Sequence, residues 1–304
     1  MADRHTIPAF LAPITARTFV SEYLDRAMLL IQRRDPDYFK QLISLSEIDR
    51  LVTSIRIPAT NFNLAQDDLP LAQNAYCDGA SYVNKERALN LHREGATIIL
   101  RSVEQWSPAL NRLRIETEKF FGCEAQTNAY LTPPSKKSTP PHWDTHDLVV
   151  LQITGRKRWR LYEGHRSLPL SDERFRIGED YVSSTYKEVV LEPGDSLYLP
   201  RGIIHEPVAD TYSVHVSIGI HPVRWYDVCC VALRMLAEQE GSPLRAALPC
   251  SHLAGSGRAS LEALPNMLDR DLIEHAMEVV RSGFAEVGTV DLEGQLLEFA
   301  RRQS

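Results

Sequence analysis

The chain has 304 residues, of which 43% are hydrophobic and 24% are charged, a balance ordinary for a globular protein with one large domain or two modest ones. Its formal net charge of −6 lacks the basic surplus of nucleic-acid-binding proteins, so we expect no direct nucleic-acid partner. No apolar stretch reaches the length of a signal-peptide core or of a membrane-spanning helix. We therefore expect no membrane association.

Residues 15–55 are predicted to form short helices, because apolar residues recur there at helical spacing. Thr15 or Thr18 can cap the first helix, and Ser46 together with Asp49 can open the last one. A strand is predicted at 96–100, followed by a helix that begins near Val103 and ends at Gly122.

Between residues 125 and 221 the pattern changes to strands. Five stretches rich in Val, Ile, Tyr and Leu are punctuated by Pro or Gly: 125–134, 148–154, 157–164, 188–200 and 211–221. Several short strands at close spacing predict a β-sandwich or barrel. The whole chain therefore reads as mainly β with flanking helices.

A helical pattern returns after Pro222, at 224–241 and 268–284. Apolar residues at helical spacing in 272–280 predict a homodimer, and packing of that helix on its own barrel is the alternative. Cys229 and Cys230 lie in the first stretch, where we expect them to be buried. The five cysteines are odd in number and form no Cys-x-x-Cys pair, which favours a reducing, cytoplasmic location over a disulfide framework or zinc ribbon.

Two histidines and two aspartates crowd into residues 142–147. If this segment is a strand, His142, Asp144 and His146 point to one side. The nitrogen of His142 and the carboxylate of Asp144 then form two corners of a 2-His-1-carboxylate iron site, which leaves three positions open. His205, in Pro-Arg-Gly-x-x-His after a Glu-Pro-Gly-Asp turn, is the candidate third ligand. A compact set with His146 in place of His205, serving a metal-dependent hydrolase, is the alternative.

Lys157 is the second unusual residue. Strand alternation puts Lys157 with Trp159 and Leu161 on one face and the neighbouring arginines on the other, wet face. An unpaired ammonium on the dry face would cost several kcal/mol or lose its proton. We expect a carboxylate partner, either internal or from a dicarboxylate ligand, and snorkelling from the strand end is the alternative.

Two further strands place small or polar groups on one face. Asn128 and Tyr130 share a face of 127–132, and His215, Ser217 and Gly219 share a face of 213–220. Such faces suit a ligand cavity inside a barrel, although a solvent-facing strand would look similar.

Taken together, four linked motifs resemble the JmjC-type cupin oxygenases, in their ribosomal-oxygenase branch of protein hydroxylases. The resemblance covers about residues 10–225, and its motifs are Asn-x-Tyr, Pro-Pro-His-x-Asp, Leu-Gln-x-x-Gly-x-Lys-x-Trp-Arg-Leu-Tyr and Pro-Arg-Gly-x-x-His. It implies a double-stranded β-helix, the cupin jelly-roll barrel, over residues 1–224 with a helical lead-in and a strand core at about 91–224. For residues 225–304 it implies a helical dimerisation region, with the usual winged helix absent or truncated.

The resemblance also implies an activity and its residues. The activity is hydroxylation of a side-chain carbon of a protein or peptide, with Fe(II), 2-oxoglutarate and O2. The implied client is a ribosomal protein or a precursor peptide. A non-catalytic cupin scaffold is the alternative. The implied roles are iron ligands at His142, Asp144 and His205, the distal carboxylate of 2-oxoglutarate at Lys157, the cosubstrate pocket at Asn128, His215 and Ser217, and the substrate side at Tyr130. Because Gly219 stands where relatives can carry a hydroxyl, that contact either comes from Ser217 or is missing.

Overall fold

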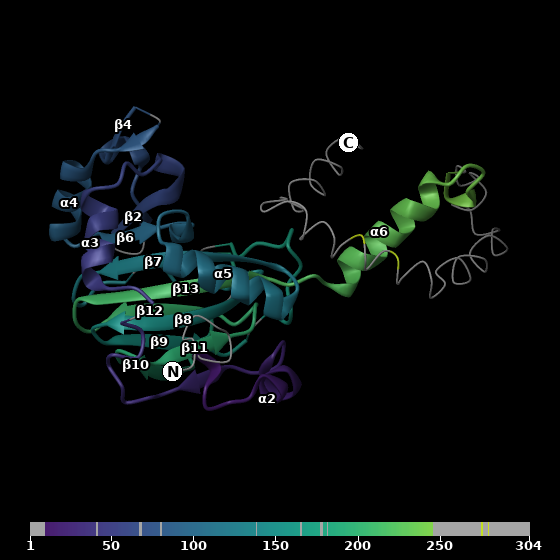
Figure 1. Ribbon diagram of the computed structural model, residues 1–304, viewed down its shortest axis with the longest axis horizontal. Coiled ribbons are helices and arrows are strands. Elements are labelled where there is room, and N and C mark those ends of the chain that lie inside the picture. The colour runs from purple at the N-terminus through teal and green to yellow at the C-terminus, as the bar shows by residue number, and fades with distance from the viewer. Residues whose placement is uncertain are drawn as a thin grey trace. The chain divides into compact units, whose positions relative to one another are not determined.

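Two antiparallel sheets form the body of the first part of the chain (Figure 1). The structure is a computed structural model that describes residues 10–40, 42–66, 69–79, 81–137, 139–164, 166–176, 179–180 and 182–245, together with His275 and Val279. The chain divides into two compact units, Met1–His221 and Pro222–Ser304. Within the described ranges, no helix is both long and apolar enough to cross a membrane.

The larger sheet has the strand order β1-β11-β8-β13-β7-β6-β2-β3 and the smaller one β10-β9-β12. In chain order, the strands of the larger sheet are β1 (Leu29–Ile31), β2 (Phe62–Gln66), β3 (Leu69–Pro70), β6 (Thr97–Leu100), β7 (Glu124–Thr132), β8 (Asp147–Thr154), β11 (Ser196–Leu199) and β13 (Ser213–His221). Those of the smaller sheet are β9 (Lys157–Tyr162), β10 (Tyr186–Leu191) and β12 (His205–Ala209). Isolated bridges from Lys137 to Val208 and from His142 to His205 lie beside β12 of the smaller sheet. The mainly β architecture predicted from the sequence is confirmed.

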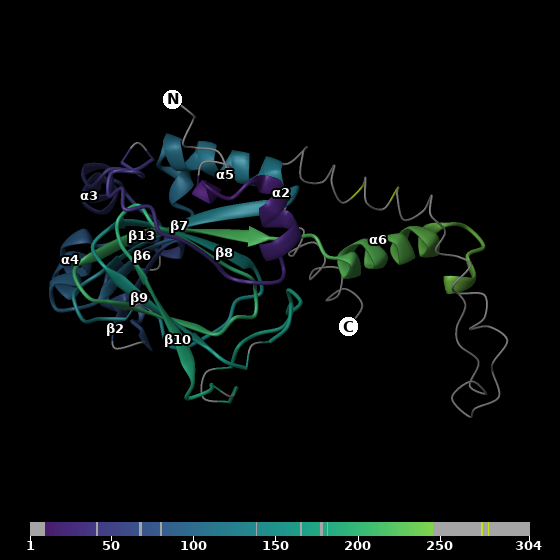
Figure 2. The same ribbon diagram turned by 90° about the horizontal axis from the view of Figure 1, so that it is seen from below.

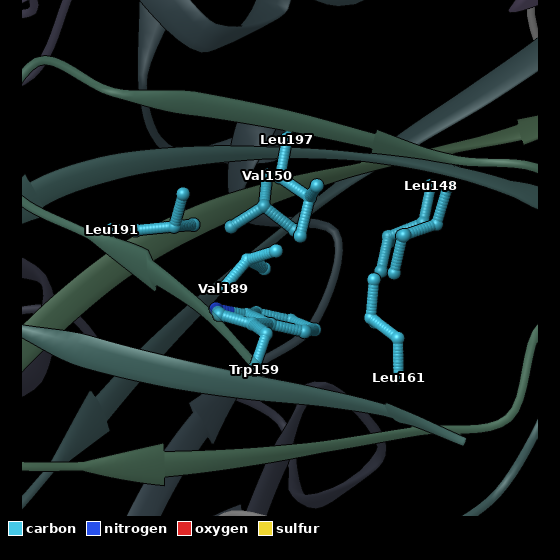
Figure 3. Close-up of a cluster of buried hydrophobic side chains, with 8 residues drawn as sticks. Leu148, Val150, Trp159, Leu161, Val189, Leu191 and Leu197 are labelled. Atoms are coloured by element: carbon cyan, nitrogen blue, oxygen red, sulfur yellow. The ribbon is translucent and has the colours of Figure 1, made fainter. Parts of the chain in front are cut away.

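Apolar side chains from the two sheets meet between them and form the core around which the site is built (Figure 3). On β9 the residues alternate between buried and half-buried, so that Lys157, Trp159 and Leu161 point inward as predicted. Trp159 packs in a cluster with Val150 of β8 and Val189 of β10. Burying each such side chain contributes about 1.5–3 kcal/mol to the free energy of unfolding, so the two sheets are held together by this contact.

The outer side of the larger sheet is covered by helix α5 (Pro108–Phe121), which lies across β7 and β13 on the side away from β9 and β10 (Figure 2). The helix begins later than predicted. Val103–Gln105 form a separate 3-10 turn (η4), and Ser107 caps α5 with Pro108 at the first helical position. Proline is well suited to that position because its missing N–H has no partner there anyway. The predicted end at Gly122 is confirmed, with φ +65° in the left-handed region.

The N-terminal segment is only partly helical. Thr15 caps α2 (Ala16–Thr18), as predicted, and a π-helical turn η1 (Phe19–Tyr23) follows. Helix α3 (Leu45–Thr53) is capped by Ser44 and not by Ser46, because the Ser44 Oγ accepts the Glu47 N–H at 3.1 Å. The prediction of helices throughout 15–55 was wrong for β1, which pairs with β11 far along the chain.

Residues 56–95 hold small elements that the sequence pattern did not reveal. They are η2 (Ala59–Asn61), η3 (Gln73–Ala75), a hairpin of β4 (Cys77–Asp78) and β5 (Tyr82–Val83), and helix α4 (Lys85–Arg93), besides β2 and β3. Strands of two residues are too short to carry a visible alternation, so only their partners identify them.

We expect the outward face of β9 to be solvated, but the structure shows that it is only partly exposed. Its arginines pair with acidic residues of neighbouring strands, and Glu206 of β12 is buried among three partners. These are Lys137 at 2.6 Å, Arg160 at 3.0 Å and the Tyr162 hydroxyl at 3.0 Å. The Glu206 carboxylate is thus satisfied, as a buried charge must be.

The second unit is described as far as residue 245. It contains helix α6 (Trp225–Glu238) and the turn η5 (Pro243–Arg245). Val228 and Ala232 are buried on one side of α6, whereas Cys229 and Cys230 are half-buried, so their predicted full burial was wrong. The helix predicted at 268–284 lies outside the described residues except at His275 and Val279, which are helical.

Candidate metal and cosubstrate site

His142, Asp144 and His205 converge where the loop at 139–146 meets the start of β12. Each offers one ligand atom, and these three atoms lie within 4.8 Å of one another. His142 Nε2 is 3.9 Å from Asp144 Oδ1, and His205 Nε2 is 3.7 Å from Asp144 Oδ2. Two backbone hydrogen bonds between His142 and His205, of 2.8 and 3.2 Å, bring the two ligand-bearing segments together. The residues assigned to the metal from the sequence are therefore adjacent in space.

The hydrogen bonds of the two imidazoles prepare them as ligands. His142 Nδ1 lies 2.8 Å from the Pro140 carbonyl, and His205 Nδ1 lies 2.9 Å from the Ile203 carbonyl. A carbonyl can only accept, so each Nδ1 carries the proton and each Nε2 keeps its lone pair. Both Nε2 atoms face Asp144, which is the arrangement that a metal ion needs.

The surroundings shift the pKa values of Asp144 and His205 downward. Burial by itself would raise the pKa of Asp144, but the imidazoles of His146, His142, His205 and His221 lower it to about 2. Burial, helped by the neighbouring His142, lowers the pKa of His205 to about 4. At neutral pH Asp144 is thus ionised and His205 is neutral, which are the forms that bind a metal.

His146 does not join this cluster, so the compact set of His142, Asp144 and His146 is not formed. The segment 140–146 is a loop with a single bridge at His142, and strand alternation therefore does not apply to it. His146 instead stacks on His221, with ring centroids 4.9 Å apart and an interplanar angle of 30°. Gly219 makes room for this pair, because a Cβ there would lie 3.0 Å from His146 Cδ2.

Replacing His146 with alanine should therefore leave the metal in place. We expect the affinity for Co(II), measured by calorimetry, to change by less than about threefold, because all three ligand atoms remain. Loss of one bound Co(II) per chain in His146→Ala would show that the ligand set includes His146.

The tight fit at Gly219 gives a second prediction. Gly219→Ala should lower the free energy of unfolding in urea by about 1–3 kcal/mol, because the new methyl group pushes on the His146 ring. In the double variant Gly219→Ala/His146→Ala most of this loss should be recovered, and the size of the recovery is the coupling between the two sites. If Gly219→Ala lowers the free energy of unfolding equally in the presence and in the absence of His146, the predicted contact between residue 219 and the His146 ring is wrong.

Lys157 is fully buried inside the barrel, with 0% of its side chain exposed. Its Nζ donates to Thr132 Oγ1 at 3.0 Å and lies 3.3 Å from His215 Nδ1. Burial lowers the pKa of Lys157 to about 7, and burial together with this ammonium lowers the pKa of His215 far below its usual range. No carboxylate is paired with Lys157 among the described residues, so both the internal partner and the snorkelling alternative are disfavoured.

Two aromatic rings connect the lysine to the metal ligands. Trp159 lies with its ring centroid 5.7 Å from that of His205 and 5.6 Å from that of His215. Tyr130 stacks on His215 at 4.6 Å, almost parallel. Burial and the nearby Asp144 carboxylate raise the pKa of Tyr130 to about 12, so this phenol stays neutral. Tyr130 therefore lies between the lysine pocket and the metal cluster.

Asn128 and Ser217 face each other across β7 and β13, since they are register partners. The Asn128 Oδ1 already accepts the Ser102 N–H at 3.1 Å. The Ser217 Oγ is buried near the Tyr130 hydroxyl but makes no hydrogen bond of ordinary geometry in the described part of the chain. A buried hydroxyl in this state can donate to a ligand.

Thr132 and Trp159 were not assigned to the site from the sequence. Both could have been found, because Thr132 continues the alternation of Asn128 and Tyr130 on β7, and Trp159 is two residues from Lys157 on β9. Strand alternation places i and i+2 on the same face.

Residues 104–228 match the family model of the JmjC domain. This is a JmjC-domain protein. The matched range contains the three candidate metal ligands and the lysine pocket, by which we mean Lys157 with its neighbours Thr132 and His215. The resemblance seen in the sequence motifs is therefore confirmed.

Curated relatives of this JmjC-domain protein include ribosomal oxygenases. Ribosomal oxygenase 2 of Mus musculus is 31% identical over 219 residues, which cover 70% of this chain and 46% of that protein. The bifunctional lysine-specific demethylase and histidyl-hydroxylase NO66 of Aedes aegypti is 30% identical over 223 residues, which cover 71% of this chain and 35% of that protein. The chain thus spans less than half the length of these two relatives.

Solved structures of YcfD from Escherichia coli share the fold. One has a TM-score of 0.53 at 16% identity and covers 88% of this chain and 71% of its own. Another, of YcfD in complex with cobalt and 2-oxoglutarate, has a TM-score of 0.51 at 18% identity and covers 89% and 71%.

Proposed function

We propose that this JmjC-domain protein is an Fe(II)- and 2-oxoglutarate-dependent dioxygenase that hydroxylates a side-chain carbon of a protein or peptide. The observation that carries the proposal is the pairing of two features in one barrel. His142, Asp144 and His205 present three metal-ligand atoms close together, and the buried Lys157 has no carboxylate partner in the part of the chain that the structure describes. A metal ion and an organic acid account for both features at once.

The three side chains suit Fe(II) better than a closed structural metal site. Two imidazole nitrogens and one carboxylate oxygen on one side of an ion leave the other positions open. When bound, Fe(II) with 2-oxoglutarate supplies the dioxygen chemistry that oxidises an unactivated C–H bond. The protein contributes orientation, since the Pro140 and Ile203 carbonyls fix both imidazole rings.

The lysine pocket suits the distal carboxylate of 2-oxoglutarate. Lys157 donates to Thr132 and to the acceptor nitrogen of His215, so a carboxylate that displaces one of these contacts gains a charge-assisted hydrogen bond. Trp159 and Tyr130 pack against His215, and both Lys157 and His215 are buried. Ser217 and Asn128 lie farther along the same face of the sheet, so we assign them to the cosubstrate and assign Tyr130 to the substrate side.

A cavity of about 660 Å³ beside the ligand-bearing segments gives room for a peptide. Trp143, between His142 and Asp144, and Ile204, before His205, line it together with the loop between β9 and β10. That loop contributes both Arg174 and Asp172. We place a peptide side chain here because the cavity adjoins both metal-bearing segments and presents charges of either sign.

A ribosomal protein is the first candidate substrate, since the curated relatives include proteins named ribosomal oxygenases. A precursor peptide is the second candidate.

We also propose a homodimer formed through the second unit, where α6 exposes Trp225, Tyr226 and Leu233. Light scattering during size-exclusion chromatography tests this proposal. The free cysteines Cys77, Cys123, Cys229 and Cys230 fit a cytoplasmic location.

Mass spectrometry tests the activity. Proteins and peptides of the host, compared with and without the gene, should contain at least one side chain that gains the mass of one oxygen atom only when the gene is present. The purified protein should convert 2-oxoglutarate to succinate in the presence of Fe(II), slowly even without peptide. Metal and 2-oxoglutarate binding without any succinate would favour the non-catalytic scaffold instead.

A further inference from the structure

A buried ion pair joins the two chain segments that carry the metal ligands. Asp147, the first residue of β8, has 0% of its side chain exposed, and Arg201 has 7%. Asp147 Oδ1 accepts the backbone N–H of Arg201 at 3.0 Å and its Nη1 at 3.2 Å. The pair lies three residues after Asp144 and four before His205, and none of its atoms belongs to the metal cluster.

Further contacts hold this pair in one arrangement. The other carboxylate oxygen of Asp147, Oδ2, accepts the Tyr198 hydroxyl at 2.8 Å, and the Arg201 guanidinium also contacts Asp25. The Tyr198 hydroxyl in turn accepts the Asp25 N–H at 3.2 Å. Each carboxylate oxygen of Asp147 thus has a donor, which holds the group in one orientation even though burial raises its pKa.

Backbone hydrogen bonds next to Arg201 link this network to the metal ligands. Gly202, next to Arg201, donates its N–H to the Asp144 carbonyl at 3.0 Å. The Ile203 carbonyl, one residue farther on, holds His205 Nδ1. A shift of Arg201 therefore moves the support of Asp144 and that of His205 together. Metal sites demand ligand positions within about 0.5 Å, so such a shift weakens binding.

We infer that Asp147 and Arg201 are positioning residues that hold Asp144 and His205 at the spacing a metal ion requires. This inference rests on the proposed metal-dependent function. It assigns a role to residues that touch neither metal nor cosubstrate. Partners behind metal ligands typically contribute about ten- to a hundredfold to metal affinity, and we expect Asp147 to contribute in that range.

The experiment measures Co(II) affinity and the visible absorption of bound Co(II) in the full chain. Asp147→Asn keeps the shape of the side chain and removes its charge, and Tyr198→Phe removes a single hydrogen bond to Asp147. We expect Co(II) binding about ten- to a hundredfold weaker in the first, severalfold weaker in the second, and an altered absorption band in both.

Asp195→Asn is the matched control. Asp195 is also buried and also precedes a strand, β11, where it accepts the N–H groups of Arg33 and Glu192. It anchors the end of β11 away from Tyr198, so its replacement should lower the unfolding temperature without weakening Co(II) binding. Equal weakening in Asp195→Asn would reduce the role of Asp147 to general stability and overturn the inference.

The outcomes separate this inference from the proposed function. If the unmodified protein binds no Co(II), or if His142→Ala binds it unchanged, the proposed function is wrong. If the unmodified protein binds Co(II) and Asp147→Asn and Tyr198→Phe match it within twofold, only the positioning role is wrong. Should Asp147→Asn not fold, Tyr198→Phe alone decides, since it keeps the ring that packs against Phe19.

Discussion

His205→Ala is expected to abolish tight metal binding and 2-oxoglutarate consumption together, while the protein stays folded. His205 supplies one of three ligand atoms from the protein and comes from a different segment than the other two. Metal-binding free energies of about 10–16 kcal/mol for four-ligand sites correspond to about 3 kcal/mol per ligand, so the affinity should fall at least a hundredfold. Calorimetry with Co(II), and the weak visible band of anaerobic Fe(II) with 2-oxoglutarate, measure the loss.

His92→Ala is a suitable control for this experiment. His92 is another partly buried histidine, whose Nδ1 lies 2.7 Å from the Ala96 carbonyl and whose Nε2 lies 3.3 Å from the Tyr212 hydroxyl. Its removal should affect stability and leave the metal in place. If His205→Ala binds Co(II) as tightly as the unmodified protein, His205 is not a metal ligand and the proposed metal site is wrong.

Lys157→Met is expected to raise stability and to destroy cosubstrate binding. Methionine is similar in length, and replacing a buried charge with a well-packed apolar group is often stabilising by about 1–4 kcal/mol. The same change removes the ammonium that would meet the distal carboxylate, and losing one partner of a buried charge pair costs about 2–5 kcal/mol. We therefore expect the dissociation constant for 2-oxoglutarate to rise at least about thirtyfold. Urea unfolding and calorimetry measure the two effects.

The pKa of Lys157 sets a pH dependence with a definite sign. In the folded chain this pKa is lowered from 10.5 to about 7 by burial. Between about pH 7 and 10.5 the unfolded chain binds more protons at this residue, so its contribution to the free energy of unfolding rises with pH across that range. Below pH 7 both states are protonated and the burial cost is fully present. Lys157→Met should remove this slope.

Cosubstrate binding should show the opposite trend. A dicarboxylate requires the charged lysine, so above about pH 7 binding takes up one proton, and affinity should fall by up to about tenfold per pH unit. His215 and Tyr130 do not contribute, since their pKa values keep them neutral in this range. A pH-independent affinity from pH 7 to 9 would show that Lys157 does not meet the carboxylate. Lys157→Met with unchanged affinity would show the same.

The strands with clear alternation could be predicted because their pattern depends only on local burial. Lys157, Trp159 and Leu161 were placed on the inner face of β9, and the structure confirms it. The strand β1 was missed because its three residues are stabilised by pairing with β11, over 160 residues away, and not by any local pattern. For the same reason Ser44 and Ser46 could not be told apart as the cap of α3, since both precede the same apolar run.

The sequence alone determined which residue types carry the chemistry: two histidines and an aspartate around short apolar strands, and a lysine on a face that has to be dry. Side-chain chemistry and the two-residue period of a strand are local properties, so they can be read from the chain. The motifs already favoured His205 over His146 as the third ligand, but only the tertiary structure brought His205 next to His142 and Asp144 and placed His146 against His221. It also revealed the pair of Asp147 and Arg201 behind that cluster. These outcomes depend on the closure of two sheets onto each other, and contacts between residues distant in sequence leave no periodic signal.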